Sequence, residues 1–126
     1  MTRSSPLILI VEDNLDNRLL LHDMLDLLEY DVVEAMDGLQ GVEMAASHRP
    51  SLILMDLSLP RKNGWDATRE IKSNPVTAGI PIIALTAHAM PFHREEALSA
   101  GCDDYLTKPV NFTDLAQTLR TYLPRD

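Results

Sequence analysis

The sequence holds one cysteine and no long apolar run, and each shortage excludes a class of protein. With Cys102 alone, an internal disulfide and a paired-thiol redox centre are excluded, so we expect Cys102 to be a small packing residue. No segment approaches the roughly 18 consecutive apolar residues that cross a bilayer, and no signal-peptide pattern precedes the apolar run at residues 7–11. We therefore expect a cytoplasmic protein without a membrane segment.

Positive charge is also scarce. The chain has 11 Lys and Arg against 19 Asp and Glu, which gives a formal net charge of −8. Because nucleic-acid binding depends on Lys and Arg displacing counterions from phosphates, direct binding to nucleic acid is disfavoured, and a cation or another protein is the better expected partner. The 126 residues, 45% of them hydrophobic, fit one domain over residues 1–126 with a single core.

The apolar residues form short runs that alternate with stretches of helical spacing. Runs at 7–11, 52–55 and 80–85 lack polar alternation, which is typical of strands buried on both faces of a parallel sheet. Weaker strands are predicted at 32–35 and 105–106, and helices at 14–29, 39–48, 65–72, 92–100 and 112–123. Five such β–α units, without an internal repeat, predict a doubly wound α/β fold around a five-stranded parallel sheet.

The first predicted helix has leucines on two sides. At about 100° per residue, Leu15 and Leu19 point nearly opposite to a larger apolar set that is predicted to face the core. That core set is Leu20, Leu21, Met24, Leu25 and Leu28. Leu15 and Leu19 are either scattered surface leucines or part of a docking surface for a partner.

Side chains that can do chemistry follow four of the predicted strands. Glu12 and Asp13 follow the first strand, Asp56 the third, Thr86 the fourth and Lys108 the fifth. In a parallel α/β sheet the carboxyl ends of the strands share one edge, and ligands bind there. Each residue alone has an ordinary structural explanation, such as a helix cap or a surface charge, but their joint placement favours a functional site.

Three neighbouring carboxylates repel one another unless a cation neutralises them, and a site made of oxygen ligands suits Mg²⁺. With Mg²⁺ bound and with Lys108 and Thr86 meeting phosphate oxygens, Asp56 could attack an incoming phosphorus in line. The histidines His22, His48, His88 and His93 lack the spacing of a metal site, and we expect them at the surface.

These residues resemble the receiver domains of two-component response regulators. The resemblance rests on Val11-Glu12-Asp13-Asn14, on Asp56-Leu57-Ser58-Leu59-Pro60 with Gly64 eight residues after the aspartate, on Leu85-Thr86-Ala87 and on Lys108-Pro109. It spans nearly the whole chain, and the combination is specific. It implies a flavodoxin-like (βα)₅ fold with strand order 2-1-3-4-5.

The resemblance also implies roles for individual residues. Asp56 would be the phosphoacceptor, served by a histidine kinase or a histidine phosphotransfer protein. Mg²⁺ would bind Asp56 and Asp13 directly, Glu12 often through water, and the backbone carbonyl of Ser58. Thr86 and Lys108 would contact the phosphoryl group, and the chain would promote only its own phosphorylation and dephosphorylation.

Further implications concern the response to phosphorylation. Tyr105 would be the aromatic switch that turns inward with Thr86, its alternative being an ordinary strand aromatic. The Lys108–Pro109 peptide would be cis. Ser58 and His88, two positions after Asp56 and Thr86, would set a comparatively long phosphoryl lifetime. A downstream protein would bind the face formed within residues 90–123.

Other interpretations compete with this one. A Mg²⁺-dependent phosphohydrolase would resemble Asp-x-Asp, whereas Ser58 stands where the second aspartate would be. A flavin or nucleotide binder would need glycine in the turn after the first strand, and that turn is acidic. A static pseudo-receiver would lack one of the acid, aspartate, threonine and lysine residues. The domain could be free-standing or part of a hybrid histidine kinase or a larger regulator.

Overall fold

The computed structural model describes residues 6–57, 63–86 and 99–124. Five parallel strands form one sheet in the order β2-β1-β3-β4-β5, which confirms the predicted topology. The strands are β1 (Leu7–Val11), β2 (Asp31–Ala35), β3 (Leu52–Asp56), β4 (Ile82–Thr86) and β5 (Asp104–Thr107). β4 begins two residues later than predicted, and β5 extends one residue further at each end.

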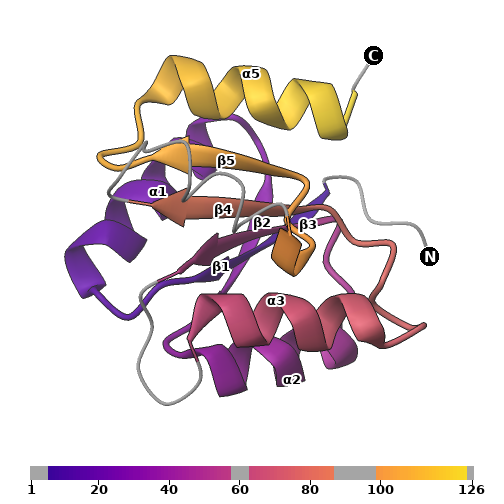
Figure 1. Cartoon of the computed structure of the whole chain (residues 1–126). Helices are drawn as coiled ribbons and strands as arrows, with labels where there is room; N and C mark the ends of the chain where they lie inside the picture. The colour runs from indigo at the N-terminus through magenta and orange to yellow at the C-terminus, as the bar shows by residue number, and fades with distance from the viewer. Residues whose placement is uncertain (1–5, 58–62, 87–98, 125–126) are drawn as a thin grey trace.

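Helices cover both faces of the sheet (Figure 1). They are α1 (Leu15–Leu27), α2 (Gly38–His48), α3 (Gly64–Ser73) and α5 (Phe112–Tyr122). Helices α2 and α3 contribute to one buried apolar cluster, and α1 and α5 contribute to the other. This is the doubly wound arrangement that the alternating pattern predicts. Most of the helix predicted at 92–100 lies outside the described residues.

The central strands are buried along their whole length, which explains why their sequences show no polar alternation. Every residue of β1 and β3 is buried. Side chains of a strand alternate between the two faces, so Leu9 and Ile53 join the cluster under α2 and α3, while Ile8 and Leu52 join the cluster under α1 and α5. Both layers of the core therefore meet at these two strands.

Each of these four helices begins with a side-chain cap. Asn14, Asp37, Asn63 and Asn111 each accept a hydrogen bond from the backbone amide three residues later. The cap of α5 is reciprocal: the Asp114 amide donates to Asn111 Oδ1, and Asn111 Nδ2 donates to Asp114 Oδ2, both at 2.8 Å. Such a cap contributes about 1 kcal/mol to stability. The caps also fix the loops that leave the carboxyl edge of the sheet.

Helix α1 differs from its prediction in the exposure of Leu20 and in the positions of both ends. Leu20 was predicted to lie in the core, but 48% of it is exposed, because α1 faces the sheet with Leu21 and Leu25, and Leu20 lies beside that line. The prediction of exposed Leu15 and Leu19 is confirmed. Asn14 caps the helix instead of entering it, and Glu29 has a positive φ of 65°, which is incompatible with a continuing helix.

The structure bears on two predictions, one drawn from the single cysteine and one from the shortness of the apolar runs. Cys102 is buried, with its Sγ 3.8 Å from Thr68 Oγ1, and burial raises the pKa of its thiol. It is therefore the packing residue that was expected. In the ranges that the structure describes, no helix is both long and apolar enough to cross a membrane.

Candidate functional site

Three carboxylates meet at the carboxyl ends of β1 and β3. These strands are paired in parallel with Val11 opposite Met55, so Glu12 follows β1 beside Asp56, the last residue of β3. One carboxylate oxygen from each of Glu12, Asp13 and Asp56 lies within 4.8 Å of the other two. Glu12 and Asp56 are buried, whereas Asp13 is exposed. The cluster therefore has a buried floor and one side open to water.

Lys108 brings a positive charge into this cluster. Its Nζ lies 2.8 Å from Glu12 Oε1 and 3.1 Å from Asp56 Oδ2. The backbone places it there, because the Lys108 amide donates to the Thr86 carbonyl at 2.7 Å. The Lys108–Pro109 bond is cis, as predicted. One ammonium faces three carboxylates, so the cluster keeps an excess of negative charge.

The pKa values of two of these groups reflect their crowding. Burial raises the pKa of Glu12 above its usual 4.5, the neighbouring Asp56 carboxyl raises it further, and Lys108 only partly offsets this. For Lys108, burial lowers the pKa, but contacts with Glu12 and Asp56 outweigh burial and leave it above 10.5. The ammonium is thus held charged, while at neutral pH the Glu12 carboxylate is held at a free-energy cost.

The donor set fits a hard divalent cation. Carboxylate oxygens are ligands that Mg²⁺ accepts, and Mg²⁺ usually retains several waters, for which exposed Asp13 leaves room. A cation would also offset the repulsion that raises the pKa of Glu12. The residues present therefore suit Mg²⁺. Ser58, predicted to add a backbone carbonyl, lies outside the described residues.

Thr86 and Tyr105 lie on the strands that adjoin the cluster. β4 pairs with β3 so that Leu85 is opposite Asp56, which places Thr86 one residue beyond it at the same edge. Tyr105 pairs with Ala84, is partly buried and packs against the apolar cluster under α2 and α3. The sheet thus brings Thr86 to the site and sets Tyr105 further back. His88 lies outside the described residues.

Among the described residues, the exposed leucines and the histidines His22 and His48 do not belong to the acid cluster. Leu15 and Leu19 lie on the open side of α1. His22 is partly exposed and His48 is exposed, which agrees with the surface prediction; His93 lies outside the described residues.

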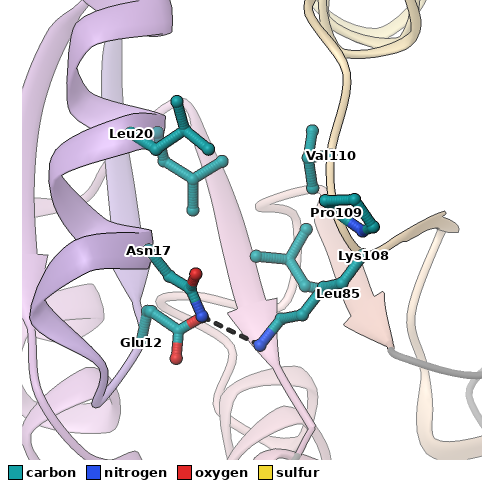
Figure 2. Close-up of a pocket in the computed structure, with 8 residues that line it drawn as sticks. Glu12, Asn17, Leu20, Leu85, Lys108, Pro109 and Val110 are labelled. Atoms are coloured by element: carbon teal, nitrogen blue, oxygen red, sulfur yellow. Dashed lines mark hydrogen bonds and ion pairs between the residues drawn. The ribbon is translucent and has the colours of Figure 1, made fainter.

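A mostly apolar pocket adjoins the cluster between α1 and the segment after β5. Figure 2 shows Glu12 and Lys108 at one end, with Leu20, Pro109 and Val110 toward the other. The full lining is Glu12, Asn17, Leu20, Leu21, Leu85, Lys108, Pro109 and Val110. Leu20 was predicted to lie in the core but lines this pocket instead, which explains why it is exposed.

Sequence reasoning missed one functional candidate and understated another. Arg18 is buried and donates to the backbone carbonyls of Glu12 and Asp13. The available signal was an arginine three residues before Leu21 and seven before Leu25, on the core side of the helix. Gly64 packs against the backbone of Asp56 and Leu57 so closely that a Cβ would collide with it. The motif glycine is thus required by the position of Asp56.

Comparisons with known proteins agree with this geometry. The family model for the response regulator receiver domain matches residues 8–120. The polar-differentiation response regulator DivK of Brucella ovis is 36% identical over 123 residues, covering 98% of each chain. DivK of Brucella anthropi is 36% identical over 116 residues, covering 92% of this chain and 94% of that one.

Two solved structures are especially informative. One is the receiver domain of a Pseudomonas aeruginosa sensor histidine kinase with Mg²⁺ coordinated in its active-site cleft, at TM-score 0.90 and 41% identity over 97% of this chain and all of that one. The other is the receiver domain of the Saccharomyces cerevisiae regulator Ssk1 in complex with the histidine phosphotransfer protein Ypd1, at TM-score 0.86 and 31% identity, covering 97% and 91%. The chain therefore belongs to the response regulator receiver family and is a receiver domain of two-component signalling.

Proposed function

We propose that Asp56 accepts a phosphoryl group from a protein histidine in a Mg²⁺-dependent step. The observation that carries this proposal is the cluster itself, with three carboxylate oxygens within 4.8 Å of one another and Lys108 Nζ 3.1 Å from Asp56. A carboxylate oxygen of Asp56 attacks the phosphorus, the new O–P bond forms as the P–N bond to the imidazole breaks, and the histidine leaves.

The residues around Asp56 position the phosphoryl group. Lys108 meets one of its oxygens and neutralises part of its charge, and Thr86 meets another with its hydroxyl. Bound Mg²⁺ supplies further charge neutralisation. We assign its protein ligands to Asp13, Asp56 and the Ser58 carbonyl, with Glu12 acting through water; the Mg²⁺ in the Pseudomonas receiver domain supports this assignment.

The donor is a histidine kinase or a histidine phosphotransfer protein. The complex of the yeast relative Ssk1 with Ypd1 supports this partner class. We propose that Leu15 and Leu19 contact the donor, because both leucines are exposed on the helix that starts beside the acid cluster. A protein donor also needs apolar surface to bury, and these two exposed leucines supply it.

The output is a change of protein partner. We propose that residues 1–126 form one receiver domain that acts on no other substrate and presents a downstream binding face within residues 90–123. Tyr105 and Thr86 are the proposed switch, and Ser58 and His88 the proposed determinants of phosphoryl lifetime. The relatives include response regulators of about this length and the receiver domain of a sensor histidine kinase. A free-standing regulator and a receiver within a larger protein are therefore both compatible with this role.

Phosphorylation by acetyl phosphate tests the proposal without a protein donor. Intact mass spectrometry is expected to show one added phosphate on the wild type with Mg²⁺, and none in excess chelator or on Asp56→Asn. Asp26→Asn, an exposed aspartate at the far end of α1, is the matched control and is expected to label like the wild type. Equal labelling of Asp56→Asn, or full labelling in chelator, would refute the mechanism.

A further inference from the structure

Arg18 is a buried cation that the proposed phosphotransfer does not use. It lies on α1 in the line of Leu21 and Leu25, and only 8% of the residue is exposed. Removing a guanidinium from water is unfavourable unless partners replace its hydration. Its contacts therefore indicate what the guanidinium does in the folded protein.

Those contacts join three parts of the fold. One guanidinium nitrogen, Nη1, donates to the carbonyl oxygen of Glu12 at 2.9 Å and to that of Asp13 at 3.2 Å. Nε donates to Glu34 Oε1 on β2 at 3.1 Å. His22 Nδ1, one turn further along α1, lies 2.8 Å from the other Glu34 oxygen. Arg18 thus links the turn after β1 to the neighbouring strand.

The contacts fix the backbone that carries two of the clustered carboxylates. The Glu12 amide donates to the Ala35 carbonyl at 3.0 Å, and its carbonyl accepts from Arg18. The Asp13 carbonyl is held by the same guanidinium nitrogen. Mutual repulsion would drive these carboxylates apart, and a fixed backbone resists that movement.

Charge explains why Glu34 accompanies Arg18. An unpaired guanidinium beside the cluster would oppose a divalent cation, since like charges repel more strongly where water is scarce. Glu34 neutralises the guanidinium at 3.1 Å and leaves its N–H groups directed at the two carbonyls. The pair supplies hydrogen-bond donors to the turn with no added net charge.

We propose that Arg18 is a positioning residue for the Mg²⁺ site and that Glu34 orients and neutralises it. This inference rests on the proposed function, because it concerns the cation bound by Glu12, Asp13 and Asp56. Arg18 touches neither the cation nor the phosphoryl group. It acts by holding the Glu12 and Asp13 backbone where both carboxylates reach the same ion.

The test compares Arg18→Met, Arg18→Lys and Glu34→Gln with Arg69→Met. Arg69 is the matched control because it also pairs with a carboxylate, Asp66 at 3.2 Å, but on the exposed surface of α3. Calorimetry gives the Kd for Mg²⁺, amide hydrogen exchange of Glu12 and Asn14 reports on the metal-free turn, and thermal unfolding checks the fold.

Arg18→Met is expected to weaken Mg²⁺ binding by about tenfold, the usual effect of losing a residue that orients metal ligands. It should also speed exchange at Glu12 and Asn14, whose amides donate to the Ala35 carbonyl and to Glu12 Oε2. Arg18→Lys should restore little, because one ammonium cannot reach both carbonyls and Glu34 in the same way. Glu34→Gln should weaken binding by leaving the guanidinium charge unpaired. Arg69→Met should match the wild type throughout.

A folded Arg18→Met with unchanged Mg²⁺ affinity and unchanged exchange would overturn the inference while leaving the proposed function standing. If Arg18→Met fails to fold, Glu34→Gln is tested by the same two measurements, the Kd for Mg²⁺ and amide hydrogen exchange. Wild-type values of both in Glu34→Gln would overturn the inference. A wild-type protein that binds no Mg²⁺ would instead refute the metal site, and the inference with it.

Discussion

Glu12 shows how one buried carboxylate links proton binding, metal binding and stability. Burial and the nearby Asp56 carboxyl raise its pKa above 4.5, the value expected in the unfolded chain. A group whose pKa is higher in the folded state favours folding below the unfolded pKa, and this contribution is lost as the pH rises through the folded pKa. The charged form of Glu12 is therefore disfavoured in the metal-free site, and a divalent cation would offset this.

Protons and Mg²⁺ should consequently compete for Glu12. We expect the Mg²⁺ affinity to fall as the pH is lowered through the raised pKa of Glu12, by up to about tenfold for each pH unit below it. Calorimetric titrations across that range would measure this. Glu12→Gln removes the titrating group, so its Mg²⁺ affinity should be weaker but should depend less on pH. An identical pH dependence in both proteins would contradict the assignment.

Helix α1 combines three tasks on two sides, one buried and one exposed. Leu21 and Leu25 pack on the sheet, Arg18 holds the turn that carries Glu12 and Asp13, and Leu15 and Leu19 remain exposed. Because the helix starts at the acid cluster, a partner that bound its exposed leucines would lie close to Asp56.

The double variant Leu15→Asp with Leu19→Asp tests that surface. Transfer from a phosphohistidine protein should slow by about tenfold or more, since charge replaces apolar contacts, while labelling by acetyl phosphate should stay near wild type. Leu27→Asp, at the opposite end of α1 and 75% exposed, is the control and should affect neither rate. Equal loss of both activities in the double variant would show that the helix itself was damaged.

The strands and helix α1 show how far the sequence could predict the structure. Unbroken apolar runs predicted buried parallel strands, and parallel strands bring their carboxyl ends to one edge, so the meeting of Glu12, Asp56 and Lys108 followed from chain order. The exposure of Leu20 could not be predicted, because it depends on the pocket that Leu20 forms with Pro109 and Val110, which are distant in sequence. The pairing of Arg18 with Glu34 was also hidden, since it depends on the approach of β2 to α1.

At the scale of the whole molecule, hydrogen bonds connect the site to the far helix. The Lys108 amide donates to the Thr86 carbonyl, and Tyr122 Oη on α5 donates to the Asp103 carbonyl at 3.0 Å, next to β5. Tyr105 lies on β5 between these two contacts in sequence. A charge added at Asp56 would therefore pull on Lys108 and Thr86 and move a strand to which α5 is bonded.

Amide NMR with Mg²⁺ and beryllofluoride, a phosphoryl mimic, would follow this coupling. Shifts in the wild type should extend from the site to Tyr105 and to α5. They should shrink at those distant positions in Thr86→Ala and in Lys108→Ala, which remove the groups that follow the new charge. Shifts confined to the surroundings of Asp13, Asp56 and Lys108 in the wild type would show that the domain accepts phosphate without this response. A partner that binds the face within residues 90–123 would then have the same affinity for the phosphorylated and the unphosphorylated domain.

The most direct test of the account is to locate the phosphoryl group on the chain. Borohydride reduces an acyl phosphate to an alcohol, so a phosphorylated aspartate becomes homoserine, while free carboxylates are left unchanged. After phosphorylation with Mg²⁺ and reduction, peptide mass spectrometry should find homoserine at position 56 alone, and at no position when chelator replaces Mg²⁺. Homoserine at Asp13 or elsewhere with Asp56 intact would contradict the assignment of Asp56 as the phosphoacceptor.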